Sequence, residues 1–165
     1  MNIKKNDLYK HNFIVIFLLI ILSYLMMGIT TVLLLMVGYQ SLAQISVFGL
    51  SHPSLGFLTT MIFSLTETFT LTYISALIKS LKQNIKEDQS AVLFKSRRKV
   101  YRHGMMSLLW ITTVFLLGGA VDTNLIPSFL HGMIFLIGFF HYFYVLKLQH
   151  QAFGDCILTV NKLTI

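Results

Sequence analysis

Histidine is the residue type in this sequence whose positions suggest chemistry. A neutral imidazole is a common ligand of haem iron and of other transition metals. The chain of 165 residues contains six histidines, which are His11, His52, His103, His131, His141 and His150. Two imidazoles can act on one group only if the chain brings them to the same place. The next question is therefore which structural elements carry them.

The composition predicts helices that lie in a membrane. Apolar residues make up 55% of the chain and charged residues 12%, whereas a soluble domain carries about 25% charged residues. Charge-free or nearly charge-free blocks lie at 13–37, 40–66, 105–121 and 127–146. A membrane-spanning helix needs about 20 mostly apolar residues, and the hydrocarbon offers the backbone no other partners. We predict an all-α integral membrane four-helix bundle with helices at about 13–37, 53–79, 104–121 and 127–147. Residues 1–165 then form one transmembrane domain, with a basic loop at 80–103 and a tail at 148–165.

The distribution of positive charge predicts the orientation of these helices. With four crossings, all 13 lysines and arginines fall on the side of the two termini, and the opposite loops carry only Asp122. The positive-inside rule then gives an N-in/C-in topology, with the 80–103 loop in the cytoplasm or an equivalent compartment. This pattern is typical of a multi-pass protein of a bacterial or organellar inner membrane. We call this side of the bundle the inner side and the opposite one the outer side.

The net charge of +7 is concentrated next to the predicted helices. Anionic lipid headgroups are therefore the expected partner of the 80–103 loop, rather than nucleic acid. The single cysteine, Cys156, excludes an internal disulfide. The first apolar run could also be a signal peptide cleaved after Ser41-Leu42-Ala43, but its length exceeds the about 7–15 apolar residues of such signals. We therefore expect the first helix to be retained.

Helix positions sort the histidines by depth. His52 and His131 start the second and fourth helices near the outer face, His103 starts the third at the inner face, and His141 lies about 9 Å above the inner end of the fourth. The sequence thus predicts two pairs at two depths, His52 with His131 and His103 with His141. Two imidazoles from different helices are the ligand set of bis-histidine haem b. The alternative is that each is a hydrogen-bonded interfacial histidine. His11 and His150 are expected to be solvated.

Glu67 is the acid that falls within a predicted span. At about 100° per residue, a polar stripe shares its face of the helix, consisting of Thr60, Ser64, Thr68 and Ser75. Acidic groups at membrane depth are costly and are often functional. We therefore predict that Glu67, Ser64 and Thr68 form a proton site or a polar intramembrane site. The alternative is a protonated Glu67 that only joins two helices.

Three short motifs carry a resemblance to a known family. They are His52-Pro53 at one helix start, Lys99-Val100-Tyr101-Arg102-His103-Gly104 at the next, and Phe129-Leu130-His131-Gly132 at the last. This pattern resembles the ascorbate-reducible transmembrane di-haem cytochromes b. The resemblance implies haem b and electron transfer across the membrane, with His52 and His131 as one ligand pair and His103 as half of another. That family has six helices and its fourth ligand lies on one absent here, so His141 would have to substitute.

Two further classes of function remain open. Small size, short outer loops and several glycines predict helix surfaces that can pack on partners, as in a non-catalytic subunit of a larger membrane complex or a homo-oligomer. Glu67 could instead serve a small proton-coupled transporter. The sequence contains no complete set of catalytic residues, phosphate-binding loop or Cys-x-x-Cys motif, and whether the protein is an enzyme stays open.

Overall fold

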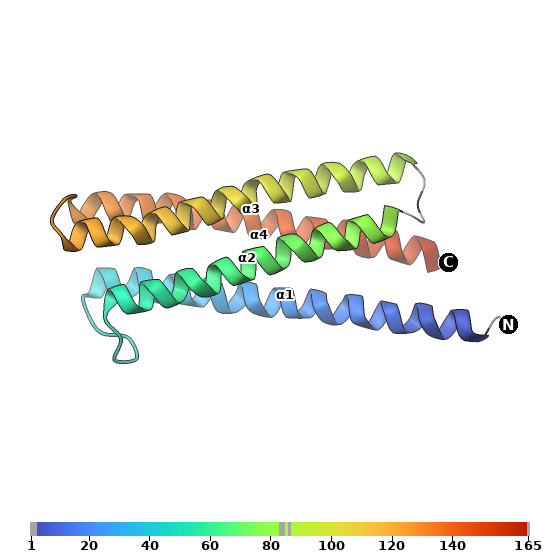
Figure 1. The fold of residues 1–165 in the computed structure, drawn as a ribbon, viewed down its shortest axis with the longest axis horizontal. Coiled ribbons are helices and arrows are strands. Elements are labelled where there is room, and N and C mark those ends of the chain that lie inside the picture. The colour runs from blue at the N-terminus through green and yellow to red at the C-terminus, as the bar shows by residue number, and fades with distance from the viewer. Residues whose placement is uncertain (1–2, 83–84, 86, 165) are drawn as a thin grey trace.

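Four long helices make up the fold. The computed structural model describes residues 3–82, 85 and 87–164, with side chains described for 14–82, 85, 87 and 90–162. The helices are α1 (Ile3–Ala43), α2 (His52–Lys82), α3 (Glu87–Asp122) and α4 (Ser128–Thr164). Successive helices run in opposite directions, so both termini lie at one end of the bundle (Figure 1). The predicted all-α four-helix bundle is confirmed. We call the end with the termini the inner end and the opposite one the outer end.

Each helix is long and apolar enough to cross a membrane. The candidate spans are Ile14–Ala43, His52–Lys82, Ser90–Asp122 and Ser128–Lys162, which contain 30 to 35 residues each. At about 1.5 Å per residue they measure about 45–53 Å, more than the about 30 Å of a hydrocarbon layer. The predicted helices at 13–37, 53–79 and 104–121 lie within α1, α2 and α3, and the fourth, predicted at 127–147, lies within α4 except for Pro127. The apolar block at 40–66 includes the α1–α2 loop at 44–51.

The helices extend further than the apolar blocks predicted. Most of the expected 80–103 loop is helical, because α2 continues to Lys82 and α3 begins at Glu87. The expected 148–165 tail is almost entirely the last part of α4. Hydropathy marks the part of a helix that meets an apolar medium, but lysine, arginine, glutamine and leucine also favour helix in water. The basic segments therefore extend the helices beyond the apolar blocks.

The turn between α3 and α4 is defined by the local sequence. Asn124 has a positive φ of 57°, a conformation that asparagine tolerates better than most residues. The amide of Leu125 donates to the carbonyl of Ala120 at 2.8 Å, and that of Asn124 donates to Val121 at 2.9 Å. This is the Schellman pattern of a helix C-terminus. Pro127, which cannot continue a hydrogen-bonded helix, follows and directly precedes α4.

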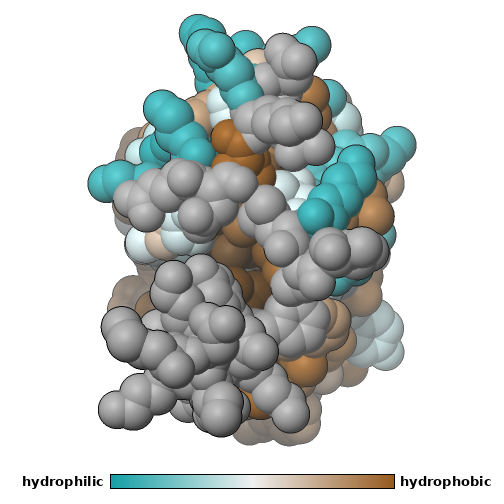
Figure 2. Space-filling view, turned by 90° about the vertical axis from the view of Figure 1, so that its right-hand side faces the viewer, coloured by the Kyte–Doolittle hydropathy of each residue, from teal (hydrophilic) through white to brown (hydrophobic). Residues whose placement is uncertain are grey.

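The inner half of the bundle contains a continuous apolar core. α1 packs mainly on α2, α2 on α3, and α3 on α4, whereas α1 and α4 make little contact. Seen from the inner end, hydrophilic side chains gather around the rim (Figure 2). The core cluster contains residues from all four helices, namely Ile20, Met27, Leu71, Ile74, Leu77, Ile78, Leu81, Leu93, Val100, Leu148, Ala152, Phe153 and Cys156. Cys156, which we had placed in the tail, is therefore a buried free thiol.

Gly104 allows α3 to approach α2 closely at the outer edge of this core. A Cβ atom added at Gly104 would lie 2.7 Å and 2.9 Å from the Cδ atoms of Leu71, and 3.2 Å from Oε2 of Glu67. Leu71 and Glu67 are both buried, so neither can move freely away. Gly104 therefore serves helix packing at this position.

Replacing Gly104 should destabilise the bundle. We expect Gly104→Ala to lower the free energy of unfolding by about 1–3 kcal/mol, the usual cost of overpacking a filled core. The measurement is reversible unfolding in mixed micelles, followed by circular dichroism. Gly28→Ala on α1 is the matched control, because a Cβ there meets nothing within 4 Å and alanine is the better helix former. Equal stability of the two variants would contradict this account of the α2–α3 contact.

Candidate functional site: a cavity with two histidines at the outer end

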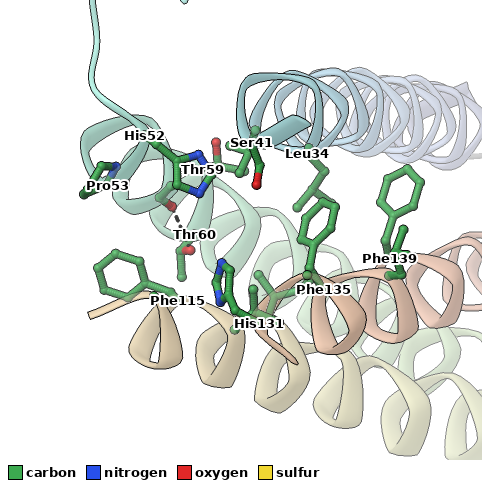
Figure 3. Close-up of a pocket in the computed structure, with 18 of the residues that line it drawn as sticks. Leu34, Ser41, His52, Pro53, Thr59, Thr60, Phe115, His131, Phe135 and Phe139 are labelled. Carbon is green, nitrogen blue, oxygen red and sulfur yellow. Dashed lines mark hydrogen bonds between the residues drawn. The ribbon is translucent and has the colours of Figure 1, made fainter. Parts of the chain in front are cut away.

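A large apolar cavity lies between the helices at the outer end. Its volume is about 680 Å³, and residues of all four helices line it. Figure 3 shows Leu34 of α1, Phe115 of α3, and Phe135 and Phe139 of α4 around it. Protein interiors are normally close-packed, with few voids larger than a water molecule. A cavity of this size instead falls in the range of about 300–1,000 Å³ that is typical of sites for cofactors and small ligands.

Glycines explain why this end of the bundle remains open. Five of them line the cavity, which are Gly38, Gly56, Gly118, Gly119 and Gly132. A Cβ atom at Gly56, Gly119 or Gly132 would meet no other atom within 4 Å. These positions border empty space, unlike Gly104 in the packed half. Gly38 differs, because its Cβ would lie 3.1 Å from the ring of Phe135, where α1 and α4 come together.

His52 and His131 both line the cavity and approach one another. His52 is the first residue of α2, and His131 lies in the first turn of α4. Their ring centroids are 6.4 Å apart and the rings are nearly perpendicular, at 89°. Figure 3 shows both rings directed into the same end of the cavity. The Nδ1 atoms of both are buried without a hydrogen-bond partner, which is unusual for a buried polar atom.

The outer pair offers two imidazoles to the same end of the cavity. With ring centroids 6.4 Å apart, both side chains are near enough to contact one bound group, and imidazole is a common ligand of haem iron. The lining is apolar and rich in aromatic rings, which suits the faces of a porphyrin. Asp122 is the one acidic side chain among its described residues. The residues present therefore fit a haem.

The inner pair, His103 and His141, is also brought together, but in a different setting. Nδ1 of His103 lies 3.4 Å from Nε2 of His141, and the ring centroids are 5.6 Å apart. The ring of Tyr144 packs edge-on against His103 at 5.0 Å. Neither histidine lines the outer cavity. The two rings share a hydrogen bond directly.

The remaining histidines lie away from both pairs. His150 is exposed, and its Nδ1 lies 2.7 Å from the hydroxyl of Tyr24 on α1. It thus has a protein partner as well as access to solvent. The side chain of His11 lies outside the described residues. Among the described side chains, no group of three or more His, Cys, Asp or Glu is placed to hold a metal ion, so a bare metal site is not supported there.

Glu67 is fully buried in the middle of α2 and pairs with α4. Nε2 of Gln149 donates a hydrogen bond to its Oε2 at 2.9 Å. The rest of the expected polar stripe does not accompany it, because Ser64 is only half-buried and Thr68 is exposed. A hydroxyl can bond the carbonyl four residues earlier, as Thr60 does with Gly56 at 2.8 Å, and then needs no polar surroundings. Hydroxyl residues are therefore poor markers of the buried face.

Sequence reasoning missed Gln149 as a site residue. It is fully buried, on a face of α4 that also includes the buried residues Tyr142, Val145 and Ala152. Their spacing of three, four and three is that of one helix face. This signal was present in the sequence, but the segment after Lys147 was expected to be a tail. The buried polar residues of the middle of the bundle also include Thr30 and Thr66, whose hydroxyl oxygens lie 2.8 Å apart.

No family model, no curated protein and no solved structure matches the chain. The assignment of function therefore depends on the site itself.

Proposed function

We propose that the protein is an integral membrane electron-transfer protein that binds haem b in its outer cavity, where His52 and His131 would hold the group. The observation that carries this proposal is the outer pair, whose ring centroids lie 6.4 Å apart at the edge of a cavity of about 680 Å³. The resemblance of the three helix-start motifs to the ascorbate-reducible cytochromes b supports the same conclusion. The inner histidines are not part of this proposal, because they contact each other directly.

The chain's own residues would bind the group and exclude water from it. His52 and His131 would each offer one neutral ring nitrogen, from helices that the rest of the bundle holds in place. The cavity is bordered towards the middle of the bundle by Leu34, Phe135 and Phe139. The cluster of Leu34, Phe63, Ile111 and Tyr142 separates it from the inner half. Haem b bound there would supply one-electron redox chemistry. The apolar lining and the one acidic side chain, Asp122, would influence the reduction potential of the haem through burial and local charge.

The membrane topology belongs to the same proposal. Most exposed basic side chains of the described residues lie in the inner half of the bundle, including Lys79, Lys82, Lys95 and Lys162, and Arg102 and Lys147 lie near its middle. The positive-inside rule would place this end in the cytoplasm or an equivalent compartment of a bacterial or organellar inner membrane. The basic segment of α3, from Lys95 to Arg102, would then lie at the level of anionic lipid headgroups, and the haem would lie near the opposite face.

An accessory role in a larger assembly is compatible with the same site. α1 packs on α2 but makes little contact with α4, and several of its large apolar side chains are exposed, including Leu18, Ile21 and Leu25. In a bilayer, lipid or a partner helix would cover them. The haem-binding chain could therefore be one redox subunit of a complex, or a homo-oligomer.

The haem proposal is tested by absorption spectroscopy of the purified protein. We expect the protein from haem-replete cells to show the sharp reduced α-band of bis-histidine haem b, with one haem per chain. His52→Ala and His131→Ala should each lower haem affinity at least tenfold, because even outer-shell partners of a metal contribute about 10–100-fold. His103→Ala and His150→Ala are the matched controls and should keep the full band. A colourless protein, or an intact His131→Ala variant with the wild-type spectrum, would exclude this site.

The topology is tested by labelling single cysteines in intact cells. In a Cys156→Ala background, Leu125→Cys lies in the α3–α4 turn, where Leu125 is 78% exposed. Lys95→Cys lies on the basic part of α3. A membrane-impermeant maleimide should label Leu125→Cys from outside, and should label Lys95→Cys only after the cells are opened. The reverse pattern would overturn the N-in/C-in orientation, and labelling of both from outside would overturn the membrane-spanning proposal.

A further inference from the structure

Glu67 and Gln149 leave two oxygen atoms without partners in the middle of the bundle. Both side chains are fully buried. One hydrogen bond joins them, from Nε2 of Gln149 to Oε2 of Glu67 at 2.9 Å. The remaining oxygens, Oε1 of Glu67 and Oε1 of Gln149, are buried and have no hydrogen-bond partner. The two unpartnered oxygens thus belong to the two partners of a single hydrogen bond.

The chemistry of the two groups limits how these oxygens can be satisfied. An ionised carboxylate only accepts hydrogen bonds, and the oxygen of a carboxamide also only accepts. With Glu67 ionised, the pair would therefore contain one satisfied and two unsatisfied acceptors, and each unsatisfied one costs about 1–3 kcal/mol. None of the described cationic side chains forms an ion pair with Glu67. A bare charge there would be costlier still.

A single proton satisfies both oxygens at once. We propose that Glu67 binds a proton on Oε1 and forms a cyclic acid–amide pair with Gln149. In this pair, Nε2 of Gln149 donates to Oε2 of Glu67, and the Oε1–H group of Glu67 donates to Oε1 of Gln149. The pair is neutral, and it joins α2 to α4 across the bundle with two hydrogen bonds. The middle of the bundle therefore contains a binding site for one proton, which does not depend on the haem proposal.

The surroundings of the pair support a closed site. Gly104 of α3 lies beside Oε2, because a Cβ atom there would be 3.2 Å away. Tyr142 lies on the same face of α4 and is also fully buried, but its hydroxyl donates to the carbonyl of Met27 at 3.5 Å. Leu71, the other residue that a Cβ atom at Gly104 would contact, is apolar. Since the carboxyl group has no access to solvent, proton exchange at Glu67 requires that α2 and α4 separate or that water enters between them.

Infrared difference spectroscopy in H₂O and D₂O tests the proton site. We expect a carbonyl band of a protonated carboxyl group at neutral pH, with the small downshift in D₂O that a carboxylic acid shows. Glu67→Gln should abolish the band while preserving the fold, because two amides can form the same cyclic pair. Asp122→Asn is the matched control, since Asp122 is exposed, and it should leave the band unchanged. A wild-type spectrum without a protonated carboxyl band would overturn the proposal, as would a band that persists in Glu67→Gln.

Two substitutions of Gln149 test the cyclic pair itself. Gln149→Leu removes both hydrogen bonds, so the carbonyl band should shift upwards to the position of a free acid. Gln149→Glu can form an acid–acid pair and should add a second protonated carboxyl band to the first. This second variant provides a test even if Gln149→Leu does not fold. A band whose frequency is unchanged in Gln149→Leu, or a Gln149→Glu spectrum with no additional band, would overturn the pairing.

Discussion

The packed inner half of the bundle is the constraint on which the outer half depends. Thirteen buried residues from all four helices form one cluster there, and Gly104 allows α3 to approach α2 at its edge. Interdigitated side chains at this density do not shift independently. Because each helix continues without a break from this core to the outer end, the core constrains their separation there. A second, smaller cluster of Leu34, Phe63, Ile111 and Tyr142 closes the middle.

The cavity and its two histidines follow from that arrangement. Where the core ends, glycines replace large side chains along the lining, and the space between the helices is left unfilled. His52 and His131 are both within the first turn of their helices, so both enter the bundle at the same level. The proposed haem site thus needs no flexible loop to bring its ligands together. The two helix starts and the core beneath them are sufficient to set the 6.4 Å between the rings.

Much of this arrangement could be predicted from the sequence, and the omissions have physical causes. The apolar blocks define the helices, and depth along them is enough to pair His52 with His131 and His103 with His141. The sequence could not distinguish a pair at a cavity from a pair in direct contact, because that difference depends on the side chains of other helices. The helix ends were underestimated, since hydropathy does not detect a helix that continues into water. Gln149 was missed for the same reason, and Thr68 was placed inward because a hydroxyl does not report which face is buried.

The weak contact between α1 and α4 has a consequence for how the cavity is filled. Residues of α1 from Leu34 to Leu42 form one wall of the cavity, yet this helix packs mainly on α2. The other three helices, with both outer histidines, hold together through the α2–α3 and α3–α4 contacts. This wall is thus formed by the helix that makes the fewest contacts with the other three. It is also the first of the four to be synthesised. The wall on α1 is therefore the part of the proposed haem site that would move outward with the smallest loss of helix packing.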